Sequence, residues 1–182
     1  MKRILIFLIF STIAFKCLSQ EKGKTRFGLE TGVLVPNEGG LGLSAALESK
    51  YNIRNNISFG LRVETLSYFK HKSYSANISS LSVTYDYYFN RDNKLISPFI
   101  GVGIGYFICE AMDFSANTVE EEYSRYNNPS CFLRLGTEFG KFRISIAYSL
   151  YRKSNEANVY NKNNDNVSLL LGFYIGGGKW RK

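Results

Sequence analysis

With 182 residues, of which 45% are apolar and 21% charged, the chain is too apolar for a disordered tail and has the size of one folded domain. Its formal charge of +8 falls to +5 once Lys2, Arg3 and Lys16 near the N-terminus are set aside. The remaining positive charge is scattered along the chain, which argues against a nucleic-acid-binding face.

The first twenty residues, MKRILIFLIFSTIAFKCLSQ, have a basic start, a short apolar run and small residues before Gln20. This pattern predicts a secretory signal peptide over 1–20 and leaves 21–182 as one exported domain. An uncleaved anchor fits less well because the apolar run is short for a bilayer. A lipid anchor on Cys17 fits less well because Lys16 stands where a small residue is needed.

The segment Ile57–Thr65 reads ISFGLRVET, in which apolar residues alternate with small or charged ones, as in a β-strand with two unlike faces. Eight alternating segments follow one another: Thr25–Val35, Leu41–Ile53, Ile57–Phe69, Ile78–Asn90, Ser97–Cys109, Cys131–Gly140, Phe142–Arg152 and Val167–Gly177. Soluble strands average about five or six residues and tilted membrane-spanning strands need about nine to eleven, so the lengths favour the second kind.

The links between these segments also alternate in length. After a short first link at Pro36–Gly40, short links are expected at Arg54–Asn56, Arg91–Ile96 and Gly140–Lys141, and long ones at Lys70–Asn77, Glu110–Ser130 and Lys153–Asn166. The sequence therefore predicts an all-β fold, an eight-stranded antiparallel up-and-down transmembrane β-barrel. Its short links and both termini would face the periplasm, and its long links the exterior.

Each strand has an apolar face and an opposite face rich in Gly, Ser and charged residues. The predicted lumen charge network comprises Glu30, Glu48, Arg62, Glu64, Asp86, Arg134, Glu138 and Arg143. Alternation alone also fits a soluble sandwich with this face in water. Mixed charge signs favour an enclosed face, and the glycines of Gly101–Gly105 would leave room for long charged side chains. Eight strands enclose a space that side chains just fill, so we expect a plugged cylinder.

Aromatic residues gather near the predicted strand ends, as expected at the two bilayer interfaces. They are Tyr68, Phe69, Tyr87, Phe89, Tyr106, Phe142, Tyr151 and Trp180.

The last strand, NVSLLLGFYIGGGKW, resembles the C-terminal signal that the outer-membrane assembly machinery reads, although Arg181 and Lys182 follow its final aromatic residue. With the leader and the strand layout, the chain resembles the small OmpX/OmpA-type barrels, in particular the outer-membrane β-barrel proteins of Bacteroidota. The resemblance implies residence in the bacterial outer membrane, with outer-membrane lipid, lipopolysaccharide and the assembly machinery as partners. It implies this residence much more firmly than any activity, and no cofactor is expected.

His71 and Ser73 are weak catalytic candidates. Their spacing on one strand resembles the His–Ser pair of the outer-membrane lipid A deacylases. By that resemblance, Ser73 of this chain would attack an ester and His71 would act as the base. Lys70 and Lys72 flank the pair, no acid follows nearby, and in that family the pair lies later in the chain. A solvated loop is the favoured interpretation.

Cys109 and Cys131 are the two cysteines of the mature chain. An even number of cysteines in an exported protein suggests a disulfide, here between these two. Two separate thiols are the alternative. Neither has a further Cys or His at metal-ligand spacing, so no metal site is expected. Acidic residues in the intervening loop, such as Glu120–Glu122, are expected to be solvated rather than to bind divalent cations.

Three functions remain open from the sequence. The favoured one is a structural or surface-interaction barrel that binds an extracellular ligand through its exterior loops. The second is a lipid-modifying enzyme built on His71 and Ser73, and the third is a secreted ligand-binding β-barrel.

Overall fold

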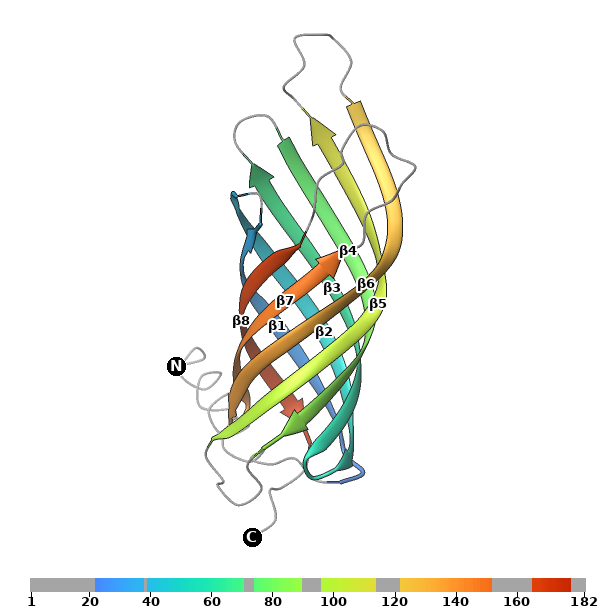
Figure 1. The fold of residues 1–182 in the computed structure, drawn as a ribbon. Helices are drawn as coiled ribbons and strands as arrows, with labels where there is room; N and C mark the ends of the chain where they lie inside the picture. Colours follow the sequence, from blue (N-terminus) through green and yellow to red (C-terminus); the bar gives the residue numbers. More distant parts are fainter. Residues whose placement is uncertain are drawn as a thin grey trace, which may run out of the picture.

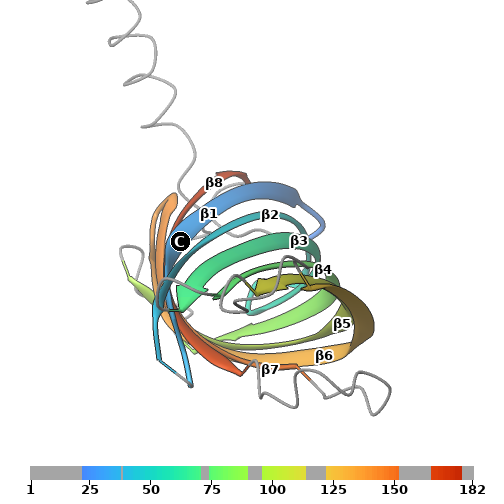
Figure 2. The ribbon, with the colours of Figure 1, turned by 90° about the horizontal axis from the view of Figure 1, so that it is seen from above.

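Eight long antiparallel strands close into a barrel. The computed structural model describes residues 22–37, 39–70, 74–89, 96–113, 122–151 and 165–177. Its strands are β1 (Thr25–Pro36), β2 (Leu41–Arg54), β3 (Ile57–Lys70), β4 (Tyr74–Tyr88), β5 (Ser97–Asp113), β6 (Glu122–Phe139), β7 (Phe142–Tyr151) and β8 (Asn166–Gly176). Each strand pairs with its neighbours in sequence, and β8 pairs with β1, so the predicted fold class is confirmed (Figures 1 and 2).

The strands are strongly tilted, which follows from their register. The row of cross-strand neighbours that starts at Leu29 and passes through β2, β3, β4 and β5 reaches β6 at Pro129. The row that leaves Leu29 through β8 and β7 reaches β6 at Phe139, ten residues further along. Such a stagger is what closes a sheet into a barrel.

The two ends of the barrel differ. At the end where β1 begins and β8 ends, here called the terminal end, β2 turns into β3 through Asn55–Asn56, and β6 turns into β7 through Gly140–Lys141. Gly140 has φ +62°, a left-handed conformation that glycine adopts readily. The opposite end, here called the loop end, carries the β1–β2, β3–β4, β5–β6 and β7–β8 links (Figure 1).

Three strands extend further toward the loop end than predicted. β4 begins at Tyr74 instead of Ile78, and β5 and β6 pair as far as Asp113 with Glu122. The predicted loop 110–130 was therefore wrong over most of its length. Both faces of this part of β6 carry polar residues, so it has none of the apolar alternation by which the other strands were recognised.

No helix among the described residues is long and apolar enough to cross a membrane. The predicted signal peptide, residues 1–20, lies outside the described part of the chain.

Candidate functional site

The outer face of the barrel is apolar, and charged side chains of its wall point inward. In β3, Phe59, Leu61 and Val63 are 42%, 59% and 54% exposed, whereas Arg62 and Glu64 between them are 1% and 7% exposed. The strand's period of two places its charged residues in the interior. The same alternation holds along β1, β2 and β7.

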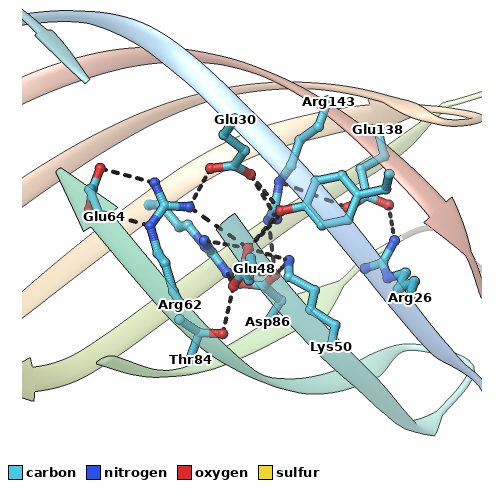
Figure 3. A network of polar contacts seen from close by, with 12 residues as sticks. Arg26, Glu30, Glu48, Lys50, Arg62, Glu64, Thr84, Asp86, Glu138 and Arg143 are labelled. Carbon is cyan, nitrogen blue, oxygen red and sulfur yellow. Dashed lines mark hydrogen bonds and ion pairs between the residues drawn. The ribbon is translucent and has the colours of Figure 1, made fainter. Parts of the chain in front are cut away.

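A connected group of ten charged side chains occupies the interior, and we call it the interior charge cluster (Figure 3). Its members come from β1, β2, β3, β4, β6 and β7, and all are buried. They are Arg26, Glu30, Glu48, Lys50, Arg62, Glu64, Asp86, Arg134, Glu138 and Arg143. Cations and carboxylates are equal in number within the cluster, so its formal charges cancel.

Two carboxylates and the cations around them form the centre of the cluster. Arg134 binds Glu48 with both terminal nitrogens, Nη1–Oε2 at 3.1 Å and Nη2–Oε1 at 2.6 Å. Its Nε lies 2.9 Å from Asp86 Oδ1. Asp86 also accepts from Arg143 Nη2 at 2.9 Å and from Lys50. Both acids are thus held by several cations, the arrangement that a charge needs when it is removed from water.

Neutral hydroxyls complete the coordination of the central carboxylates. Thr84 Oγ1 donates to Glu48 Oε1 at 2.7 Å. The Tyr174 hydroxyl lies 2.6 Å from both Glu48 Oε2 and Glu30 Oε1 and can donate to either. It also accepts from Arg143 Nη1 at 3.0 Å, so β8 is tied to the charges of β1, β2 and β7.

Arg62 forms the side of the cluster that faces the loop end. Its Nη2 and Nε lie 3.0 and 3.3 Å from the two oxygens of Glu64, and its Nη1 donates to Glu30.

Arg26 forms the side that faces the terminal end. Its Nη1 donates to Glu138 Oε2 at 2.7 Å, and its Nη2 donates to the Tyr88 hydroxyl. That hydroxyl in turn donates to Glu138 Oε1 at 2.8 Å. A closed triangle of β1, β4 and β6 side chains therefore lies at this end.

Inward-facing glycines make room for these large side chains. A Cβ at Gly101 would lie 2.0 Å from Asp86 Oδ1, and one at Gly103 would lie 2.3 Å from ring atoms of Phe132. The guanidinium carbon of Arg134 stands 5.4 Å from the Phe132 ring centroid, and that of Arg143 only 3.6 Å from the Phe99 ring. Such contacts add cation–π attraction to the ion pairs.

A second interior group lies closer to the loop end, and we call it the apolar cluster. Its members are Leu34, Leu66, Ala76, Ile78, Phe107, Cys109 and Tyr151. The rings of Phe107 and Tyr151 meet edge to face with centroids 4.7 Å apart. Beside it, Asp165 accepts from the backbone N–H of Tyr151 at 3.2 Å, which joins the end of β7 to the residue before β8.

The eight residues predicted for the lumen charge network all point inward and all belong to the interior charge cluster. The prediction omitted Arg26 and Lys50, although each lies in phase with a residue that it included, Glu30 and Glu48. Tyr88 and Tyr174 were also missed, because the prediction took only charged residues for the network, although Tyr88 lies in phase with Asp86 and Tyr174 out of phase with Phe173 and Ile175.

The predicted disulfide is not present. Cys109 is buried in the apolar cluster, whereas Cys131 is exposed on the outer face. In the β5–β6 register Cys109 stands opposite Tyr126 and Cys131 opposite Ile104, five residues away. The prediction placed both cysteines where a strand meets a loop, but the sheet continues past them.

The predicted catalytic candidates His71 and Ser73 lie outside the described residues. Tyr151, predicted to lie at the bilayer interface, instead points inward and is 5% exposed.

The cluster's chemistry is that of a filled interior. Its carboxylates are each bonded to at least one cation, and no described group of three or more His, Cys, Asp or Glu side chains is placed to hold a metal ion. A carboxylate so held is a poor base and a poor nucleophile. The arrangement can join six strands, and it offers no described reactive group.

No protein-family model matches the chain. No curated protein matches it either. Solved structures do match it. Neisserial surface protein A (NspA) superimposes with a TM-score of 0.63 and 16% sequence identity over 85% of this chain and 97% of its own. The fold is that of small bacterial outer-membrane β-barrels.

Two further structures match over nearly their whole lengths. The N-terminal β-barrel domain of Pseudomonas aeruginosa OprF gives a TM-score of 0.51 at 13% identity and covers 86% of this chain and 100% of its own. The outer membrane enzyme PagL gives 0.55 at 14% identity and covers 81% of this chain and 98% of its own. At these identities the likeness is one of fold.

Proposed function

We propose that the chain is an integral β-barrel protein of a bacterial outer membrane, exported with a cleaved signal peptide, with a plugged lumen and a structural or surface-interaction role. The observation that carries the proposal is the inverted distribution of polarity. Leucine, isoleucine, valine and aromatic side chains cover the outside of all eight strands, and charged side chains are paired inside. In water, that much exposed apolar surface would drive aggregation, whereas in a bilayer it is solvated by acyl chains.

The same distribution argues against a secreted ligand-binding barrel. Such a barrel would need a polar outer face and an interior open to a ligand. Here Leu43, Leu47 and Ile104 are each more than 60% exposed, while the centre is occupied by Arg62, Arg134 and Arg143.

The plugged lumen makes the exterior loops the proposed carriers of function. Side chains from six strands meet across the centre, so passage of a solute would require breaking several buried ion pairs together. The proposed partners are outer-membrane lipid and lipopolysaccharide around the wall, the assembly machinery during insertion, and an extracellular ligand at the loop end. Kinship with the Bacteroidota barrels stays a prediction.

Electrophoresis of the detergent-extracted chain with and without boiling tests the proposal. An intact small barrel resists SDS and migrates differently until it is heated. We expect two mobilities, and we expect the protein in the outer-membrane fraction of the producing cell. A single mobility together with recovery in the detergent-free soluble fraction would refute membrane residence.

A lipid-modifying enzyme is the second candidate, favoured by the fold that the chain shares with PagL, described as an outer membrane enzyme. The residues proposed for the activity are His71 and Ser73. Overexpression of the unaltered chain, of His71→Ala and of Ser73→Ala, followed by mass spectrometry of lipid A, tests it. The enzyme proposal requires loss of an acyl chain that both substitutions prevent, and unchanged lipid A with the unaltered chain would refute it.

A further inference from the structure

Three exposed cationic residues lie at the terminal end of the barrel. The segment that precedes β1 lies alongside the end of β2, because the Gly23 N–H donates to Asn52 O at 2.7 Å and the Asn52 N–H donates to Lys24 O at 3.0 Å. The Lys22 N–H reaches the side chain of Asn55 at 3.1 Å. These contacts place Lys24 beside Asn52 and Lys22 beside Asn55, each within two residues of Arg54 along the chain, and we call Lys22, Lys24 and Arg54 the basic corner.

An apolar wall begins directly beside the basic corner. Tyr51 and Ile53 of β2 are exposed on the outer face, one on each side of Asn52. Tyr51 stands opposite Phe59 in the register, and Phe59 stands opposite Tyr85. The Phe59 and Tyr85 rings meet edge to face at 5.1 Å. A row of aromatic rings thus runs along the wall next to the cations.

The charge of this corner is not balanced by the described surface near it. The three exposed charged side chains that the structure describes at the terminal end are all cationic. At the other side of the molecule, Arg125 has an exposed partner, with its Nε 3.6 Å from Glu110 Oε1. The described part of the chain therefore presents a local excess of positive charge at one end of its apolar wall.

We propose that the basic corner binds the phosphate headgroup of an anionic phospholipid in the leaflet at the terminal end, with that lipid's acyl chains against Tyr51 and Phe59. Lysine side chains are long enough to lie along the apolar surface and still reach a headgroup. Clustered Lys and Arg next to a bilayer attract anionic lipids, and aromatic rings fix the depth of the wall in the interface. The inference rests on the proposed membrane residence.

Quenching of a single tryptophan by brominated lipids tests this inference. The reporter is Tyr51→Trp in a Trp180→Phe background, with the chain reconstituted in phosphatidylcholine vesicles that contain phosphatidylglycerol. Bromine is carried on the acyl chains of one lipid or of the other, at the same molar fraction. We expect phosphatidylglycerol to be favoured at the reporter by about fivefold or more, and we expect this preference to fall with added salt.

Variants of the corner supply the control. In Lys22→Gln/Lys24→Gln/Arg54→Gln the preference should fall to about one, whereas Lys22→Arg/Lys24→Arg/Arg54→Lys should retain it. Arg125→Gln, which removes a cation elsewhere, should also retain it. Equal quenching by the two lipids in the unaltered barrel, or an unchanged preference in the Gln variant, would overturn the inference. Absence of quenching by either lipid would instead overturn membrane residence.

Discussion

The interior charge cluster and the apolar cluster fill neighbouring parts of one tube with opposite chemistry. Toward the terminal end, ten charged residues and the hydroxyls of Thr84, Tyr88 and Tyr174 are joined by directional bonds. Toward the loop end, seven mainly apolar residues pack against one another, with the rings of Phe107 and Tyr151 in edge-to-face contact. Buried charges have to be satisfied in one geometry, so the first part specifies which strands meet and in which register. The second part excludes water and tolerates changes of shape.

Substitutions in the two clusters should therefore destabilise the barrel by different amounts and for different reasons. A charge that loses its partner remains buried at a large cost in free energy, whereas an apolar side chain that is shortened leaves a cavity of limited cost. The free energy of unfolding in urea from phospholipid vesicles, followed by intrinsic fluorescence, measures this difference.

Arg134→Met should give the largest loss, about 3–5 kcal/mol, because it leaves Glu48 and Asp86 without their shared guanidinium. The second substitution in Arg134→Met/Glu48→Gln should recover part of that loss, since one uncompensated charge is then removed. If the double variant were as unstable as the sum of the two single variants, the two residues would not be coupled.

Leu66→Ala in the apolar cluster should lower the free energy of unfolding by about 2–4 kcal/mol. Leu66 is 1% exposed, so the shorter side chain leaves a cavity that the neighbouring side chains fill only in part. Leu61→Ala in the same strand is the matched control, because Leu61 is 59% exposed and lipid can occupy the vacated space. The control should cost clearly less. Equal losses at the two positions would mean that Leu61 is also packed against protein.

Gly103→Ala should cost about 1–3 kcal/mol, because the new methyl would lie 2.3 Å from Phe132, at the side of the charge cluster. A compensating Phe132→Leu should restore part of the stability by making room for the methyl. Stability unchanged by Gly103→Ala would show that the Phe132 ring is free to move aside.

Arg125→Gln should have the smallest effect, below about 1 kcal/mol, because its pair with Glu110 is exposed and screened by salt. The contrast with Arg134 sharpens the comparison, since the two arginines lie in the same strand. If Arg125→Gln lowered the free energy of unfolding as much as Arg134→Met, the part of β6 at the loop end would have to be buried in a contact.

The alternation of residue types was enough to predict the barrel and the eight charged residues that point inward. Period-two patterning assigns a face to each residue once one member of a strand is placed, so Arg26 and Lys50 were within reach of the same argument. The same argument reaches Tyr88, which lies in phase with Asp86, and Tyr174, which lies out of phase with Phe173 and Ile175. Residue type alone does not place them, because a tyrosine suits lipid, interface or interior equally.

The extension of β5 and β6 and the separation of the two cysteines could not be read from the pattern. Where a hairpin carries polar residues on both faces, the sequence resembles a loop. The predicted disulfide failed for that reason, since Cys109 and Cys131 lie on opposite faces of a continuous sheet.

Spin-label accessibility measures the central claim most directly. In a Cys109→Ala/Cys131→Ser background, single cysteines at Leu61, Val63 and Leu81 carry a nitroxide, and a label at Arg125 is the control, with the barrel in vesicles. We expect the first three labels to collide often with oxygen and rarely with a water-soluble nickel complex, and the control to show the reverse. Frequent collision of the Leu61, Val63 and Leu81 labels with nickel would mean that water covers this wall, and the account would be wrong.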